Sequence, residues 1–317
     1  MKINILIIVL CLFINNMQLY AQCCSAGSPS GSDGVLGGIS KNELILNIFH
    51  RHSLSKDYFH QSVKTEMPVI DRSFFDFLNF TASYGISDKF AFHTELGYFV
   101  DKTQRVFFDS TLHKIQSRGL GDLSIALKYK LYNSFDRQKQ LIVTGGLKIP
   151  VGAFNEEQNG ITIPVSLQPS SGALKMNGSL YFMQKNPAKK IGWNMLIMAE
   201  LSNRIEKGFI EYKYGNYLQY MAGTNFTHNK NLISYLNIKY ELRGRDQREY
   251  KTIIESSGGH VVYLNPSIKL SLPKNWSIII LGDIPVYKYV NGYQLTNFFA
   301  FQTGIRKDIL NCFKNTD

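Results

Sequence analysis

The sequence predicts an all-β protein, a closed antiparallel transmembrane β-barrel of about twelve strands with up-and-down topology. Three observations lead to this fold class. Apolar and polar residues alternate over long stretches, short and long connections alternate along the chain, and aromatic residues make up 13% of the composition. Alternation with period two is that of a β-strand whose two faces meet different surroundings. A large soluble β-protein is also rich in aromatic residues. The lengths of the connections therefore have to distinguish a transmembrane barrel from a soluble β-protein.

The clearest pair of strands lies in residues 119–152. Apolar side chains occupy every second position over 123–131 and again over 141–151, and the polar turn 133–138 separates the two runs. Each run approaches the roughly 9–11 residues with which a tilted strand crosses a bilayer, and exceeds the five or six usual in soluble sheets. We therefore expect an amphipathic hairpin that the rest of the chain repeats.

The same pattern recurs along the chain, with connections that alternate in length. We expect strands at about 42–52, 73–84, 89–101, 123–131, 141–151, 174–184, 193–201, 212–227, 232–243, 262–270, 276–287 and 296–309. Every connection after an even-numbered strand is short, whereas those after odd-numbered strands are longer or charged. Transmembrane barrels have this arrangement, with short periplasmic turns, longer outer loops and an even strand number. Pro266 lacks a ladder donor, so we expect it near a strand end or a bulge.

In lipid the apolar face must point outward, so the opposite face lines the lumen. The polar positions of that face are the candidates for lining a transport path: Glu95, Lys128, Lys130, Lys148, Glu200, Lys239, Glu241, Arg243, Asn265, Lys269 and Asp283. Opposite charges in a narrow lumen are expected to pair, at least in part. Eight strands leave room only for side chains and sixteen leave a water channel. A twelve-stranded barrel should therefore have a partly filled lumen, narrowed further by residues 22–40 or 152–173.

The N-terminus has the features of a cleaved secretory signal. Lys2 precedes an apolar run over 5–14, and a small residue, Ala21, marks the cleavage site. The expected organisation is a signal peptide at 1–21, a Gly/Ser-rich head at 22–40, the barrel at 41–310 and a tail at 311–317. A lipoprotein signal is the alternative because Cys23 follows closely, but Gln22 stands where such signals carry a small residue. Export predicts the bacterial outer membrane.

Three cysteines remain after such cleavage: Cys23, Cys24 and Cys312. An odd number in an exported protein leaves one thiol over. A disulfide from Cys312 to the tandem pair is conceivable, since an even strand number brings both termini to one side. Thiolates also bind soft metals, but no histidine lies nearby at metal-site spacing, so a metal role stays open and structural cysteines are the more common case. No cofactor is expected.

A formal net charge of +11 can indicate a protein that binds nucleic acid. The secretory signal and the dispersed lysines and arginines argue against nucleic-acid binding. The sequence also lacks a Gly-rich loop between a strand and a helix, which argues against a nucleotide-binding site. The expected partners are outer-membrane lipid, the barrel-assembly machinery and a small-molecule solute. The last strand carries Lys307 where an aromatic residue is common in such barrels, which weakens the insertion signal.

Several short motifs carry a resemblance to a known family. They are 119–123 (GLGDL), 146–152 (GLKIPVG), Asn265-Pro266, 284–286 (IPV) and 291–295 (NGYQL). The chain resembles the outer-membrane barrels of the phenol-degradation meta-pathway transporter-like family over roughly 119–304. Its signal and Cys-Cys head are similar to those of exported Bacteroidota barrels. The resemblance implies passage of small, often hydrophobic compounds, and makes Asn265 and Asp283 the leading lumen candidates.

Two other functions compete with an outer-membrane channel or transporter. A hydrolase on a barrel would need a serine or aspartate within reach of a histidine. Asp109 and His113 form the only such pair worth naming, and most such pairs are solvated loop residues, so we do not expect an enzyme. A structural or adhesive barrel, whose loops bind a partner, is the third hypothesis. Its lumen charges would then serve stability alone.

Overall fold

The computed structural model describes residues 38–310, apart from residues 68, 110, 137, 159, 208 and 209. The predicted signal peptide, most of the head and the tail lie outside the described residues, as do Cys23, Cys24 and Cys312. The disulfide and metal expectations for these cysteines therefore stay predictions.

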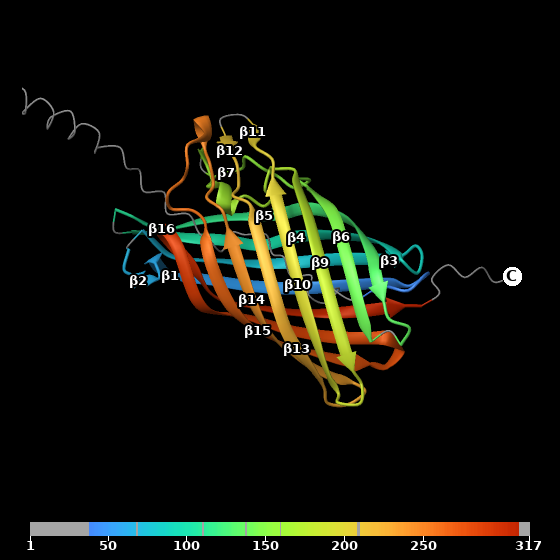
Figure 1. The fold of residues 1–317 in the computed structure, drawn as a ribbon. Helices are drawn as coiled ribbons and strands as arrows, with labels where there is room; N and C mark the ends of the chain where they lie inside the picture. Colours follow the sequence, from blue (N-terminus) through green and yellow to red (C-terminus); the bar gives the residue numbers. More distant parts are fainter. Residues whose placement is uncertain are drawn as a thin grey trace, which may run out of the picture.

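The described chain forms one closed antiparallel barrel (Figure 1). Eleven labelled strands make the ring in sequence order, and pairing of the last with the first closes it, while the short β2 (Val63–Thr65) pairs beside β1. The ring strands are β1 (Leu44–Gln61), β3 (Ile70–Gly85), β4 (Phe90–Phe108), β5 (Thr111–Asn133), β6 (Lys139–Ile149), β9 (Lys175–Asn186), β10 (Ile191–Ser202), β13 (Tyr217–Thr227), β14 (Leu232–Arg243), β15 (Gly259–Leu272) and β16 (Trp276–Ile309). The up-and-down order confirms the predicted fold class.

The last strand, β16, reverses direction within its length. Its residues 276–290 pair antiparallel with β15 and its residues 290–309 pair antiparallel with β1. Val290 contacts both neighbours, opposite Gly259 and Gln61, and Gly292 in the reversal has a φ of 59°. The two arms correspond to the last two predicted strands, so twelve segments cross the barrel. The prediction of a loop between these two segments is wrong, because the chain reverses in a tight turn.

Several strands extend further than the alternation indicated, all at the same end of the barrel. β1 continues to Gln61, where a loop of about twenty residues was expected. β4 continues to Phe108 and β5 begins at Thr111, in place of the expected loop before Gly119. The segment before β13 belongs instead to a separate hairpin of β11 (Ile205–Lys207) and β12 (Ile210–Tyr212). In these extensions apolar residues are adjacent rather than alternate, as at 58–59 of β1 and 106–108 of β4, so period-two hydropathy does not reveal them.

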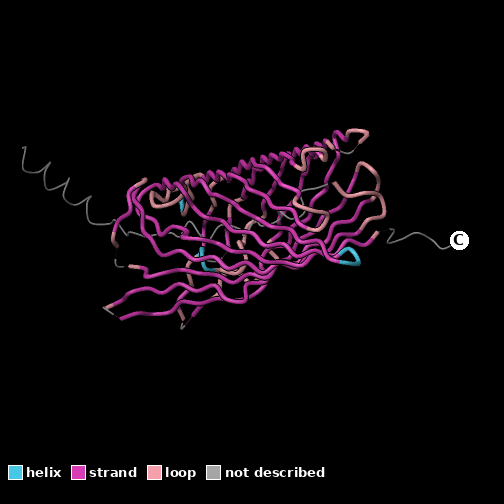
Figure 2. Tube along the Cα trace, turned by 90° about the horizontal axis from the view of Figure 1, so that it is seen from below, coloured by secondary structure: helices cyan, strands magenta, loops and turns pink. Residues whose placement is uncertain are grey.

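The two ends of the barrel differ as predicted. Connections 86–89, 134–138, 187–190, 228–231 and 273–275 are short and share one end, which we call the short-turn end. The other, the long-loop end, carries 150–174, 203–216 and 244–258, with the small strands β7 (Glu157–Gln158) and β8 (Ile161–Thr162) (Figures 1 and 2). No helix in the described part of the chain is long and apolar enough to cross a bilayer.

The outer wall is an apolar belt between two aromatic girdles. Tyr220, Tyr240, His260 and Tyr287 form a ladder with ring-centroid distances of 5.8–6.2 Å toward the long-loop end. Trp276 marks the short-turn end, on the same strand as Tyr287. A rise of about 3.3 Å per residue and a tilt of about 40° place these two residues about 28 Å apart along the barrel axis, close to the ~25 Å apolar band of outer-membrane barrels.

Two details depart from a uniform outer wall and ladder. His50 and His52 share the outward face of β1 with Ile48, and both rings lie 3.0 Å from Asp76 Oδ1 on β3, a polar cluster within the apolar wall. Pro266 was expected near a strand end or a bulge; it lies well inside β15, and a register shift of the β15–β16 pair falls between Val262 and Tyr263. The ladder with β16 is interrupted at Pro266, between the pairs of Leu264 and Ser267, where the proline has no N–H to donate.

Candidate functional site in the barrel lumen

The polar positions predicted to line the lumen lie on the inner face of the barrel. Asn265 and Asp283 are fully buried, with 0% and 1% exposure, and Lys239 is 4% exposed. The outward neighbours Leu236, Ile238 and Leu242 are exposed on the apolar wall. Alternation along each strand therefore separates the two environments as the period-two pattern requires.

A chain of hydrogen bonds crosses the middle of the lumen wall and ends at Asp283. The amide of Asn194 donates to Asn237 Oδ1 at 2.9 Å, Asn237 donates to Asn265 Oδ1 at 3.1 Å, and Asn265 donates to Asp283 Oδ1 at 2.9 Å. Asn237 and Asn265 each donate and accept, so the chain runs in one direction from Asn194 to Asp283 and its bonds polarise one another. We call these four residues the Asn–Asp chain.

Two cations complete the coordination of Asp283. Arg51 Nη2 lies 2.7 Å from Oδ2, and Lys239 Nζ lies 2.9 Å from Oδ1 and 3.0 Å from Glu241 Oε1. The carboxylate thus joins β1, β14, β15 and β16 in a site where side chains are almost fully covered. Because a buried charge is tolerated only when paired and hydrogen-bonded, this arrangement explains how the lumen holds four charged groups at close range.

Gly223 makes the Asn–Asp chain possible. It lies on β13 directly between Asn194 on β10 and Asn237 on β14. A Cβ at this position would lie 2.2 Å from Asn237 Oδ1. The bond between the two asparagines therefore reaches across an intervening strand only because that strand carries no side chain there.

A second group of charges lies nearer the long-loop end. Glu200 on β10 accepts Lys148 Nζ at 2.7 Å and Lys175 Nζ at 3.2 Å, from β6 and β9. Glu95 on β4 accepts the amide of Asn79 at 3.0 Å. Small cavities of about 100 and 70 Å³ border these groups, each lined also by Arg243. Side chains therefore fill most of the lumen at this level, as expected for a barrel of this size.

The loop 150–174 closes the long-loop end from inside. Its residues Leu167 and Gln168 are 2% and 1% exposed. Lys102 Nζ donates to the carbonyl of Gln168 at 2.8 Å, and the hydroxyl of Ser117 donates to the carbonyl of Leu167. This loop, which we call the plug loop, contains the segment 152–173 that was expected to narrow the lumen.

Asp122 holds the next residues of the plug loop. Its Oδ1 accepts the hydroxyl of Ser170 at 2.7 Å and the backbone N–H of Ser171 at 2.9 Å. Tyr214 donates its hydroxyl to the carbonyl of Ser171 at 3.1 Å, and burial raises the pKa of this tyrosine, so it remains a donor. Phe154 packs with Ile205 and Tyr212, and Ile254 of the loop 244–258 packs against the same cluster, so three loops share one cap.

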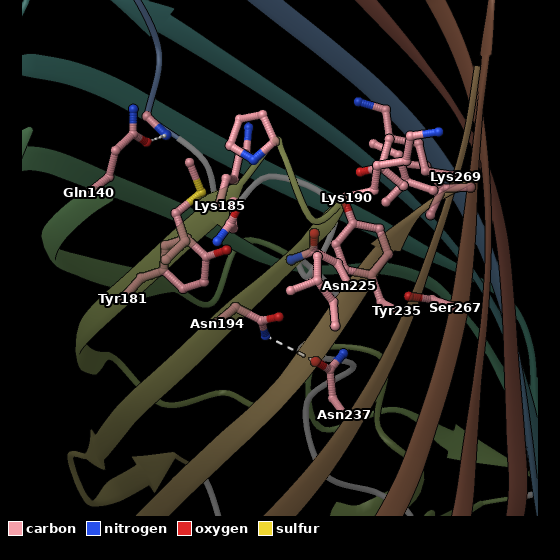
Figure 3. Close-up of a pocket in the computed structure, with 18 of the residues that line it drawn as sticks. Gln140, Tyr181, Lys185, Lys190, Asn194, Asn225, Tyr235, Asn237, Ser267 and Lys269 are labelled. Atoms are coloured by element: carbon pink, nitrogen blue, oxygen red, sulfur yellow. Dashed lines mark hydrogen bonds between the residues drawn. The ribbon is translucent and has the colours of Figure 1, made fainter. Parts of the chain in front are cut away.

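The short-turn end, by contrast, holds a cavity of about 900 Å³ (Figure 3). Asn194 and Asn237 lie at its inner wall, and Tyr181, Lys185 and Lys269 are among the side chains that line it. The backbone N–H of Gly38 donates to the side chain of Gln140 at 3.2 Å, so the start of the described chain borders the cavity. We call this cavity the vestibule.

The structure brings together the residues of the short motifs. Gly152 lies against the backbone of Leu120, where a Cβ would come within 1.7 Å of its carbonyl oxygen, so 119–123 and 146–152 pack on each other. Asn265 and Asp283 are hydrogen-bonded. Gln294 bonds to the carbonyl of Gly258 at 2.8 Å across the reversal of β16. The motifs therefore form the plug-loop anchor, the Asn–Asp chain and the final turn.

Sequence reasoning missed several lumen residues. Arg51, Lys175 and Asp122 were not among the candidates, nor were Asn194 and Asn237, which connect to Asp283 through Asn265. Arg51 could have been found, since it continues the inward series of Asn47 and Phe49 on β1. The partners of Asp122 could not, because the plug loop has no periodic pattern.

The alternative chemistries find little geometric support. His113 bonds to the hydroxyl of Thr111 at 2.7 Å rather than to Asp109, at the exposed tip of the β4–β5 hairpin. Within the described residues no group of three or more His, Cys, Asp or Glu side chains is placed to hold a metal ion. The charged lumen groups serve mainly as partners of one another.

Comparison with known proteins gives the family. The model of the family described as "Putative MetA-pathway of phenol degradation" matches residues 73–292. The chain belongs to this family. The match covers most of β3 to the reversal of β16, and it includes the motifs at 119–123, 146–152, 265–266 and 284–286 and the first two residues of 291–295. No curated protein sequence matches the chain.

A solved structure shares the fold, and a second was also matched. An outer membrane channel from Pseudomonas putida F1 superposes with a TM-score of 0.70 at 10% identity, over 87% of this chain and 98% of that one. A FadL homologue from Pseudomonas aeruginosa gives a TM-score of 0.44 at 10% identity, over 84% and 90%. With its family, its apolar belt and its two girdles, the chain is a β-barrel of the bacterial outer membrane.

Proposed function

We propose that this member of the MetA-pathway family is an outer-membrane channel or transporter for small organic solutes, with a lumen that is closed at rest. The observation that carries the proposal is the asymmetry of the lumen. A vestibule of about 900 Å³ lies at one end, and the plug loop seals the other through a few polar anchors. A barrel that served only as a scaffold would have no need of a chamber of ligand size.

The plug loop is the element that has to move. Its anchors are hydrogen bonds to side chains of β4 and β5, each worth about 0.5–1.5 kcal/mol net, or more where a charge takes part. Such bonds can be exchanged for a solute or water without unfolding the barrel. Beneath the loop, a solute passes the ion pairs of Glu200 and then the Asn–Asp chain, so these candidates form the proposed path.

Liposome swelling and planar-bilayer conductance test the proposal. The purified barrel should pass small organic solutes slowly, and Asp122→Ala should raise the rate severalfold by freeing Ser170 and Ser171. The matched control is Asp109→Ala, an exposed carboxylate on the same end whose loss should change nothing. A folded barrel that passes neither solute nor current, with and without Asp122→Ala, would refute the channel and favour the structural or adhesive alternative.

A further inference from the structure

The vestibule combines a basic rim with an apolar interior. Six lining residues are lysine or arginine and Asp88 is the only carboxylate among the described residues of the lining. The cationic lining residues are Lys130, Lys185, Lys190, Lys230, Lys269 and Arg306. We propose that the vestibule is a binding site for organic anions that carry one acidic group on an apolar body. As the substrate class of the channel this rests on the proposed function, whereas binding itself needs no conduction.

Charge pairing distinguishes the vestibule from the rest of the lumen. In the middle of the barrel Arg51, Lys148, Lys175 and Lys239 all lie within 3.2 Å of a carboxylate. At the vestibule, Lys185, Lys190, Lys230 and Lys269 have no carboxylate within ion-pair distance among the described residues. The fold thus neutralises its charges where the lumen is filled and leaves a positive field where it is hollow. A concave, low-dielectric wall focuses such a field on an anion.

Apolar side chains lie deeper than the charges. Lys269 and Arg306 lie within three residues of the short-turn ends of β15 and β16. Tyr181, Met221 and Leu281 lie five or six residues from the short-turn ends of their strands, and they are 9%, 3% and 3% exposed. Tyr181 and Met221 pack in one cluster with Ile142 and Leu196. An inward-facing apolar cluster is unusual in a polar lumen, and it fits the apolar body of a ligand.

Neutral polar groups stand between the two zones. Figure 3 shows Asn225, Tyr235 and Ser267 along the wall between Lys190, Lys269 and the Asn194–Asn237 pair. They offer donors and acceptors that would fix the orientation of a bound acid. The cavity volume also falls within the roughly 300–1,000 Å³ of small-molecule sites. The ligand would enter with its apolar body foremost and its acid toward the rim.

Calorimetry on the barrel in neutral phosphatidylcholine nanodiscs tests the site, with empty nanodiscs as the blank. The probes are 4-phenylbutyrate, its neutral analogue 4-phenylbutan-1-ol, and acetate. Phenylbutyrate should bind about tenfold or more tightly than the alcohol, because charge-assisted hydrogen bonds to lysine are worth more than neutral ones. Acetate, which lacks the apolar body, should bind weakly. Raising the salt concentration should weaken the binding of phenylbutyrate and leave the binding of the alcohol unchanged.

A matched pair of variants locates the site. Lys185→Gln/Lys190→Gln/Lys269→Gln should lower phenylbutyrate affinity about tenfold and leave the alcohol unchanged. Lys89→Gln/Lys139→Gln/Lys189→Gln removes the same charge from exposed positions near the short-turn end that do not line the vestibule, and should have no effect.

The outcomes separate the site from the channel. Equal affinity for acid and alcohol, no anion binding, or equal losses in both triple variants would each overturn the proposal. The first two comparisons use the unmodified protein, so a variant that does not fold leaves the test intact. Specific anion binding without swelling of liposomes would refute the channel and support the anion-binding site. Swelling of liposomes without a preference for the anion would support the channel and refute the anion-binding site.

Discussion

Replacement of Asp283 by asparagine tests the central polar network most directly. The carboxylate accepts three donors, from Arg51 at 2.7 Å and from Lys239 and Asn265 at 2.9 Å each. At an effective dielectric of about 20, each of the two ion pairs has a gross attraction of about 6 kcal/mol. Desolvation offsets much of this, so the measured loss should be nearer the ~3–5 kcal/mol typical of a buried pair that loses one partner.

The assay is a denaturant titration of the barrel refolded into phosphatidylcholine bilayers. Trp193 and Trp276, the two tryptophans of the chain, lie on the outer wall and report insertion by fluorescence. Asp283→Asn should lower the free energy of unfolding by about 3–5 kcal/mol at unchanged m-value. Asp88→Asn, an exposed carboxylate at the short-turn end, should change it by less than about 0.5 kcal/mol.

A double variant shows whether the charges cause the loss. In Asp283→Asn/Lys239→Met one of the stranded cations is removed, so part of the lost stability should return and the coupling energy should exceed about 1 kcal/mol. A loss below about 1 kcal/mol for Asp283→Asn would contradict the reasoning, because the two cations would then be solvated rather than held by this carboxylate.

Two further predictions concern the same lumen. Gly223→Ala should break the hydrogen bond between Asn194 and Asn237 and lower the free energy of unfolding by about 1–3 kcal/mol in the same titration. Gly145→Ala on β6, where a new Cβ meets nothing within 4 Å, should leave the free energy of unfolding unchanged. Equal effects of the two would show that only β-propensity is being measured. Glu200→Gln should leave the charges of Lys148 and Lys175 without their carboxylate partner. The reversal potential measured in a salt gradient should then shift toward anion preference. An unchanged reversal potential would place Glu200 outside the conducting path.

The strands were predictable because a membrane imposes one rule on every crossing segment. Lipid accepts apolar side chains only, so the alternation of Leu236, Ile238 and Leu242 against Lys239 and Glu241 survives in sequence. The rule ends at the membrane surface. Beyond it β1, β4 and β5 continue in water, where both faces can be polar, and their true length was missed.

The candidate site was predictable as a list of inward positions and not as a set of contacts. Asp283 and Asn265 were identified through their motifs, and the structure shows them bonded to each other. Arg51 comes from the other end of the chain and meets Asp283 only because the barrel closes. The plug loop lacks periodicity, so its burial depends on Asp122 and Lys102, which no local pattern links to it.

Sequence alone determined the barrel, its inner and outer faces and which end carries the short turns, because each of these follows from the alternation of residues along single strands and from the lengths of the connections. Tertiary structure decided which inward charges pair, that the plug loop fills one end, and that four lysines with no carboxylate partner among the described residues border a hollow at the other. These features depend on distances across the lumen between strands far apart in sequence, and register and closure set such distances only once the whole ring has formed.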